Sequence, residues 1–161
     1  MFNFKAEFYL KIIFLFSFIA LISAFFIEYV LGHQPCNLCL IERIPYGLSI
    51  IIIMSIFLIK KNQKFLILLL ILTFIFSFSI SIYHYGIEQG FFQESSVCGV
   101  NNLTESITKE DLLKQLSEKT ISCRDVTFRI FGLSLTSINI VISLLFIITL
   151  FKIFTKYEKN K

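Results

Sequence analysis

Residues 65–85 read FLILLLILTFIFSFSISIYHY, a stretch without an acidic residue, a lysine or an arginine. A helix needs about 20 apolar residues to cross the hydrocarbon core of a bilayer, so this stretch predicts a transmembrane helix. Three further apolar runs are predicted to span, at about residues 12–31, 44–59 and 133–151. We therefore expect an all-α membrane protein, a four-transmembrane-helix bundle that forms a single domain over residues 1–161.

The composition agrees with a membrane protein. Hydrophobic residues make up 56% of the chain and charged residues 16%, with a mean hydropathy of +0.79; a soluble domain carries about 25% charged residues. This balance excludes a disordered chain, a secreted disulfide-rich miniprotein and a basic nucleic-acid-binding module. The run 12–31 also exceeds a typical signal-peptide core, so we expect it to span the membrane.

The run 44–59 is short for a span. A helix that begins at or before Cys39 and is kinked at Pro45 would be long enough. The spans then leave two loops on one side of the membrane, at about residues 32–43 and 86–132. In the larger loop, Thr108 and Asp111 form a capping box ahead of an apolar leucine stripe, which predicts a short amphipathic helix.

The lysines predict the orientation. They concentrate in the N-terminal tail, around residues 60–64 and in the C-terminal tail, where only Glu7 and Glu158 oppose them. Cytoplasmic segments carry such an excess of positive charge. We expect both termini in the cytoplasm of a bacterium, with the chain in its inner membrane. All four cysteines then face the periplasm, where disulfides form and persist.

Cys36 and Cys39 form a Cys-x-x-Cys motif at a membrane edge. Such a pair closes a small, reducible ring and often contains a thiol of lowered pKa. The competing interpretation is a structural disulfide, but a short ring stabilises little. Arg43 lies one helical turn after Cys39 and could stabilise a thiolate there, or could be an interfacial anchor. Glu42 could pair with Arg43 or only mark the membrane edge.

Cys98 and Cys123 flank the helix expected in the large loop. A stapling disulfide would stabilise by roughly 3 kcal/mol, whereas an accessible disulfide in a flexible loop could exchange with an outside thiolate. Zinc is disfavoured because only the first cysteine pair is closely spaced, so we expect no metal. Two pairs outside the bilayer can relay two electrons, with a lipid-soluble quinone as the natural acceptor. The chain contains no haem-attachment or nucleotide-binding motif that would indicate a different electron acceptor.

The motifs together resemble the quinone-dependent thiol oxidases of the disulfide bond formation protein B (DsbB) family, over nearly the full chain. The resemblance rests on four features in the expected order: Pro35-Cys36-Asn37-Leu38-Cys39-Leu40-Ile41-Glu42-Arg43 with Tyr46, Tyr83-His84, the loop cysteines, and Gly132-Leu133-Ser134 followed by Asn139.

The resemblance implies an enzyme that reoxidises a periplasmic thioredoxin-fold oxidase of the DsbA type and so sustains protein disulfide bond formation. It implies that Cys98 and Cys123 form the disulfide that the partner attacks at Cys98. Cys36 and Cys39 would reoxidise that pair, with Cys39 facing ubiquinone or menaquinone. It further implies a set of quinone-binding residues: Arg43, His84 and Tyr46.

Other interpretations stay open. The vitamin K epoxide reductase family also has four spans and two cysteine pairs, but its Cys-x-x-Cys usually comes last. A non-catalytic membrane protein with two structural disulfides is the alternative from another class. A transporter is disfavoured because no ionisable residue lies in the middle of a span.

Overall fold

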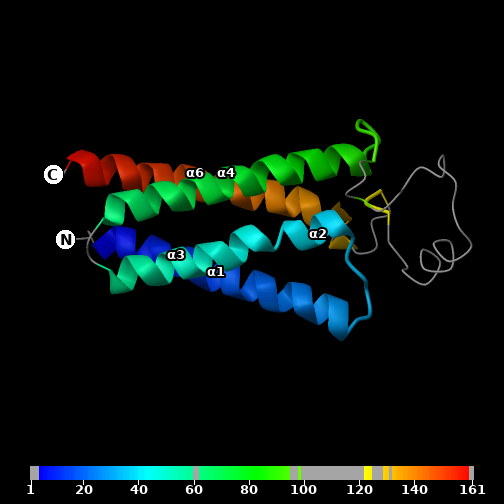
Figure 1. Ribbon diagram of the computed structural model, residues 1–161, viewed down its shortest axis with the longest axis horizontal. Helices are drawn as coiled ribbons and strands as arrows, with labels where there is room; N and C mark the ends of the chain where they lie inside the picture. The colour runs from blue at the N-terminus through cyan, green and yellow to red at the C-terminus, as the bar shows by residue number, and fades with distance from the viewer. Residues whose placement is uncertain are drawn as a thin grey trace, which may run out of the picture.

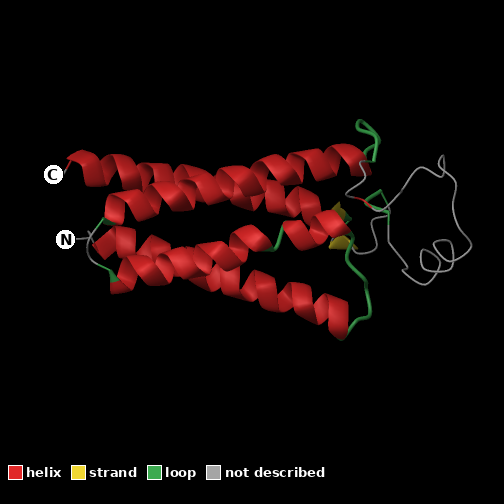
Figure 2. Ribbon diagram, in the orientation of Figure 1, coloured by secondary structure: helices red, strands yellow, loops and turns green. Residues whose placement is uncertain are grey.

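The computed structural model describes residues 4–59, 62–94, 98, 122–124, 129–130 and 132–159. Helices dominate this part of the chain (Figure 2). In chain order the elements are α1 (Phe4–Tyr29), α2 (Asn37–Ile41), α3 (Ile44–Leu58), α4 (Gln63–Glu88), β1 (Arg129–Ile130), β2 (Leu133–Ser134) and α6 (Leu135–Lys159).

The long helices run side by side as an elongated bundle (Figure 1). Helix α4 packs against both α6 and α3, and α3 packs against α1, whereas α1 and α6 barely meet. Both chain ends lie at one end of the bundle, and all four cysteines lie toward the other, which we call the cysteine end. In the described part of the chain, four helical segments are long and apolar enough to cross a membrane. The predicted four-helix membrane bundle is thereby confirmed.

The helices extend beyond the predicted spans because backbone hydrogen bonding continues past the apolar runs. Helix α1 already begins at Phe4, and α4 ends only at Glu88. The second span combines α2 and α3 into the segment Asn37–Leu58. The chain turns at Glu42 and Arg43, just before Pro45, which lies in the first turn of α3. Proline is tolerated there because the first helical N–H groups have no partner within the helix.

A two-stranded antiparallel hairpin precedes α6 and was not expected from the sequence. Strand β1 pairs with β2 in the register Arg129↔Ser134 and Ile130↔Leu133. Gly132 in the turn has a φ of +82°, a conformation that favours glycine. The amphipathic helix expected near residues 108–116 lies outside the described residues.

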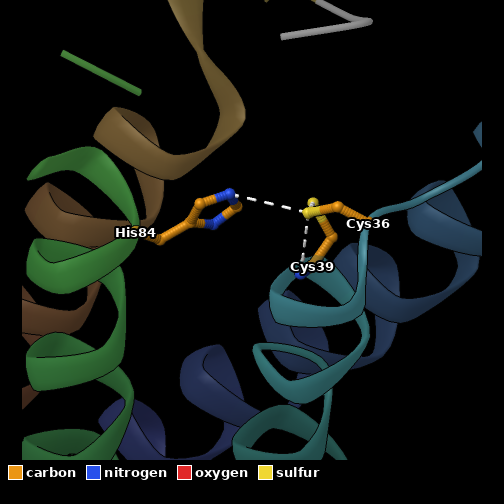
Figure 3. A group of neighbouring side chains, drawn as sticks. All are labelled: Cys36, Cys39 and His84. Carbon is orange, nitrogen blue, oxygen red and sulfur yellow. Dashed lines mark hydrogen bonds between the residues drawn. The ribbon is translucent and has the colours of Figure 1, made fainter. Parts of the chain in front are cut away.

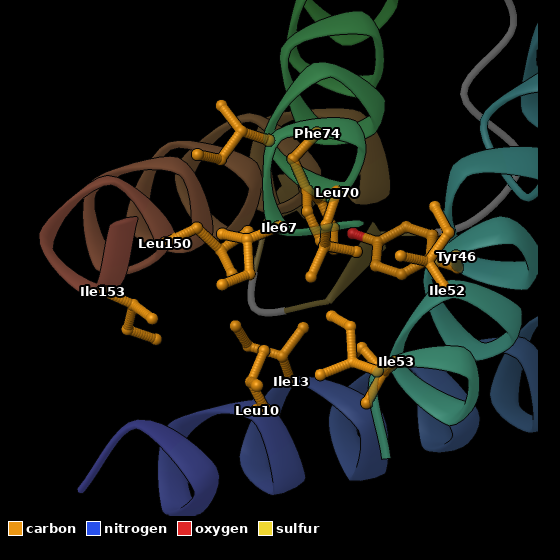
Figure 4. Packing of buried hydrophobic residues seen from close by; sticks show 12 residues of the cluster. Leu10, Ile13, Tyr46, Ile52, Ile53, Ile67, Leu70, Phe74, Leu150 and Ile153 are labelled. Atoms are coloured by element: carbon orange, nitrogen blue, oxygen red, sulfur yellow. The ribbon is translucent and has the colours of Figure 1, made fainter. Parts of the chain in front are cut away.

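The apolar core occupies the half of the bundle nearest the chain ends. Leu10 and Ile13 of α1, Ile53 of α3, Phe74 of α4 and Leu150 of α6 are almost fully buried there (Figure 4). Outward-facing side chains are also apolar, including Phe18, Ile51, Leu72 and Val141. A bundle that is apolar inside and outside fits a lipid environment, because exposing its apolar outer surface to water would be unfavourable.

Toward the cysteine end the interior becomes polar, and Asn139 of α6 connects the helices there. Its Nδ2 donates to Glu42 Oε2 at 3.1 Å and to Ser81 Oγ at 2.8 Å. Its Oδ1 accepts from the Tyr46 hydroxyl and, at 3.4 Å, from Ser143 Oγ. One amide thus joins side chains from α3 and α4 to α6.

Asn139→Leu is expected to lower the free energy of unfolding by about 1–3 kcal/mol, since it leaves the buried Tyr46 hydroxyl and Glu42 oxygen with fewer partners. The measurement is denaturant unfolding in mixed micelles. Ser143→Ala is the control, because Ser143 contributes only one long contact to Asn139. Equal effects of the two substitutions would contradict a central role for the amide.

Candidate redox site at the cysteine end

The Cys-x-x-Cys motif adopts its local structure because Cys36 caps α2. Cys36 is in an extended conformation at the N-cap position, and its Sγ accepts a hydrogen bond from the backbone N–H of Cys39 at 3.3 Å. The cap places the two sulfur atoms 2.6 Å apart as free cysteines. Sulfur atoms this close can form or open a disulfide with little backbone movement.

His84 reaches this pair from α4 (Figure 3). Its Nε2 lies 3.6 Å from Cys36 Sγ, and its Nδ1 lies 3.0 Å from Glu42 Oε1 and 3.3 Å from Thr136 Oγ1. An ionised carboxylate only accepts hydrogen bonds, so the proton belongs on Nδ1 when the ring is neutral. Nε2 then faces Cys36 as a base. The ring is only 2% exposed, which holds it in this orientation.

These contacts favour the thiolate form of Cys36. The hydrogen bond from the Cys39 thiol is the largest cause, and His84 adds a hydrogen bond and positive charge. Together they outweigh burial and lower the pKa of the Cys36 thiol from 9.0 to about 5. The contact with His84 therefore favours a thiolate on Cys36 in the reduced pair, and a thiolate at Cys39, which the sequence suggested, stays a prediction.

Arg43 and Glu42 have different partners. The sequence had left open whether these two residues pair with each other. Arg43 forms an ion pair with Glu28 of α1 and lies over the Phe25 ring, 5.3 Å from its centroid. Glu42 instead binds His84 and Asn139. Because the chain turns between α2 and α3, these two neighbouring side chains bind residues of different helices.

A cavity of about 270 Å³ lies beside the pair, between α1, the α2–α3 segment and α6. Its walls are mostly apolar side chains of α1 and α6, such as Ala20 and Ile142. Cys39, Arg43 and Tyr46 belong to the lining. His84 does not; it contacts Cys36 on the other side of the motif. Only one sulfur of the pair thus faces the cavity.

The loop cysteines form a disulfide with each other, Cys98 with Cys123. Both are almost fully buried, and they share one apolar cluster with Cys36, Leu38 and Ile87. The sequence left open whether this pair is a stapling disulfide or an accessible one; in the structure it packs against residues of α2 and α4. All four cysteines are consequently gathered in one region.

Several polar residues of the site were missed by sequence reasoning. Glu28 interrupts the apolar run 12–31 near its end and was not singled out, yet it pairs with Arg43. Thr136 and Glu88 were not singled out, and the Thr136 hydroxyl donates to Glu88 Oε1 at 2.6 Å. The four-residue spacing of His84 and Glu88 was the available signal, because it places both on one helical face.

Comparison with known proteins agrees with this architecture. The family model described as disulfide bond formation protein DsbB matches residues 6–153. A protein of Rickettsia prowazekii (strain Madrid E), itself uncharacterized, is 28% identical over 147 residues, covering 90% of this chain and 86% of its own length. The match over nearly the whole chain, on a four-helix membrane bundle with its cysteines gathered at one end, shows that this protein belongs to the DsbB family of disulfide bond formation proteins.

Proposed function

We propose that the protein is a thiol:quinone oxidoreductase that reoxidises a periplasmic DsbA-type dithiol oxidase. Electrons would pass from the partner to Cys98–Cys123, then to Cys36–Cys39, and finally to ubiquinone or menaquinone. We further propose that the chain acts as a single domain in the bacterial inner membrane, with both termini cytoplasmic and all four cysteines periplasmic. Membership of the DsbB family supports this setting.

The observation that carries the proposal is the position of Cys39 in the cavity wall. Its sulfur lines an apolar cavity between helices, while Cys36 beside it belongs to the cluster that contains the loop disulfide. The residues present fit a quinone. Apolar side chains of α1 and α6 suit a ring and an isoprenoid tail, and Arg43 with Tyr46 supplies polar groups at one end.

The relay balances electrons and protons at each step. A partner thiolate attacks Cys98, Cys123 leaves as a thiolate, and the second partner thiol completes the exchange, so the partner is oxidised and the loop pair reduced. The loop pair then reduces the Cys36–Cys39 disulfide in the same manner. Finally, the reduced inner pair gives two electrons and two protons to the quinone, which leaves as quinol, and the inner disulfide re-forms.

The buried polar groups have distinct tasks in this sequence of reactions. His84 Nε2 accepts the proton of Cys36, so that Cys36 is a thiolate when the reduced pair gives its two electrons to the quinone and the inner disulfide re-forms. Glu42 fixes the His84 ring through Nδ1. Arg43 offers a charged donor at the cavity wall, and Glu28 positions it.

The test is anaerobic reduction of ubiquinone or menaquinone by the purified protein, supplied with a reduced DsbA-type partner. We expect the quinone absorbance to fall with the intact chain and to stay constant with Cys36→Ser. If no quinone is reduced by the folded protein with any partner tested, the oxidoreductase proposal fails, and two structural disulfides become the better interpretation.

Cys98→Ser is expected to stop reduction of the quinone by the protein partner, because the partner loses the disulfide that it attacks. The inner pair is retained, so dithiothreitol at high concentration should still drive quinone reduction. The two electron donors are compared in the same anaerobic assay. Undiminished activity with the protein partner would remove the loop pair from the relay.

A further inference from the structure

We propose that the reduced Cys36–Cys39 pair and His84 form a binding site for a thiophilic divalent cation of the zinc class. The ligand atoms of these three side chains all lie within 4.8 Å of one another. Two thiolates and an imidazole are ligands that zinc prefers. They come from the beginning of α2 and from the end of α4, so the bundle itself brings them together (Figure 3).

The distances fit a tetrahedral ion with one small adjustment. Zinc binds sulfur at about 2.3 Å and imidazole nitrogen at about 2.0–2.1 Å, which separates neighbouring S and N ligands by roughly 3.6 Å. The distance from Cys36 Sγ to His84 Nε2 is 3.6 Å. The two sulfurs, at 2.6 Å, must move apart by roughly 1 Å. Cys39 borders the cavity and has space for that rotation.

His84 is oriented as a metal ligand. Glu42 Oε1 holds its Nδ1 at 3.0 Å, which leaves the lone pair of Nε2 directed toward Cys36. A carboxylate behind the imidazole is the usual outer partner of a metal-binding histidine, because it fixes the tautomer and raises the basicity of the ligand nitrogen. Here the carboxylate is present in the protein before any ion binds.

Glu88 lies beside His84 and is the second observation that points to a cation. Its side chain is only 5% exposed, and its Oε1 lies 3.9 Å from His84 Nε2. Its Oε2 is buried and, within the described part of the chain, has no hydrogen-bond partner. Leaving a buried carboxylate oxygen unpaired is costly. A cation beside His84 would satisfy it.

The site exists only while the inner pair is reduced. Binding releases two protons to solvent, the one on the Cys39 thiol and the one that His84 Nε2 took from Cys36. Both sulfurs are then held as thiolates on the ion, so they cannot close to a disulfide. A bound ion would therefore stop electron transfer at the Cys36–Cys39 step, and a chelator would restore it. The binding itself requires neither quinone nor partner, so it can be tested apart from the proposed oxidoreductase function.

The test uses the full-length Cys98→Ser/Cys123→Ser protein, in which only the inner pair remains. After reduction with a phosphine and removal of the reductant under nitrogen, Co²⁺ is titrated as a spectroscopic probe and then displaced by Zn²⁺. We expect one ion per chain, a tetrahedral cobalt–thiolate spectrum, and protection of Cys36 and Cys39 from alkylation. The oxidised protein should bind none.

Matched variants distinguish the proposed cation site from cation binding by the two thiols alone. His84→Gln should weaken binding by about 100-fold or more, and Glu88→Gln by about 10–100-fold. His33→Gln, which changes the other histidine of the chain, should leave the affinity unchanged. Unchanged affinity in both His84→Gln and Glu88→Gln, or no protection of the thiols by zinc in the intact protein, would overturn the site. Neither result would decide the oxidoreductase proposal, which the quinone assay tests separately.

Discussion

Cys39→Ser should reduce quinone turnover to the background rate of the uncatalysed reaction. A serine hydroxyl at this position cannot form the inner disulfide, so the electrons that arrive at Cys36 have no partner sulfur through which to leave. The effect is the largest we expect, because the rest of the relay depends on this bond. The measurement is anaerobic quinone reduction with a reduced DsbA-type partner.

The control for Cys39→Ser must show that the cavity and the loop pair are intact. Serine is close in size to cysteine, and Cys39 is only half-buried, so the unfolding midpoint should change little. A single turnover of partner oxidation at Cys98–Cys123 should also survive. Quinone reduction at the rate of the unmodified protein would show that electrons do not pass through Cys39.

Arg43→Ala should raise the KM for quinone by about 10–100-fold. A hydrogen bond from a charged donor is worth roughly 1.5–3 kcal/mol, and each 1.4 kcal/mol corresponds to a factor of ten. Because the guanidinium lines the cavity but takes no part in the exchange between sulfur atoms, kcat should fall less than kcat/KM. Steady-state kinetics over a range of quinone concentrations provide both constants.

The ion pair with Glu28 allows a double-mutant cycle. Glu28→Gln keeps a polar acceptor beside Arg43 but removes the charge, so its effect on KM should be smaller than that of Arg43→Ala. In the double variant the two effects should not add, because Glu28 acts on the quinone only by positioning Arg43. Strict additivity would show that Glu28 acts independently, and an unchanged KM in Arg43→Ala would reduce Arg43 to an interfacial anchor.

The fold could be predicted from the sequence to a large extent. Apolar runs long enough to cross a bilayer are a local property, so the four spans were recognisable without knowledge of their packing. The extension of the second span across the Glu42–Arg43 turn was predictable because Pro45 limits where a helix can begin. The β1–β2 hairpin was missed, since each strand is only two residues long.

The site was accessible to sequence reasoning only in part. Cys36, Cys39 and Arg43 were recognisable because they lie close together in one motif. The partners of Arg43 and Glu42 were not, because Glu28 and His84 lie on other helices. The roles of the predicted quinone-binding residues remain predictions, with Arg43 and Tyr46 in the cavity wall and His84 behind Cys36.

By itself, the sequence determined that the chain spans a membrane and carries two cysteine pairs, because hydropathy and residue spacing are local properties of the chain. Only the tertiary structure decided which charges face each other, which sulfur borders the cavity and that the loop disulfide is buried. These features depend on how four helices are rotated about their own axes. That rotation is set by long-range packing and by hydrogen bonds such as those of Asn139, which link residues far apart in sequence.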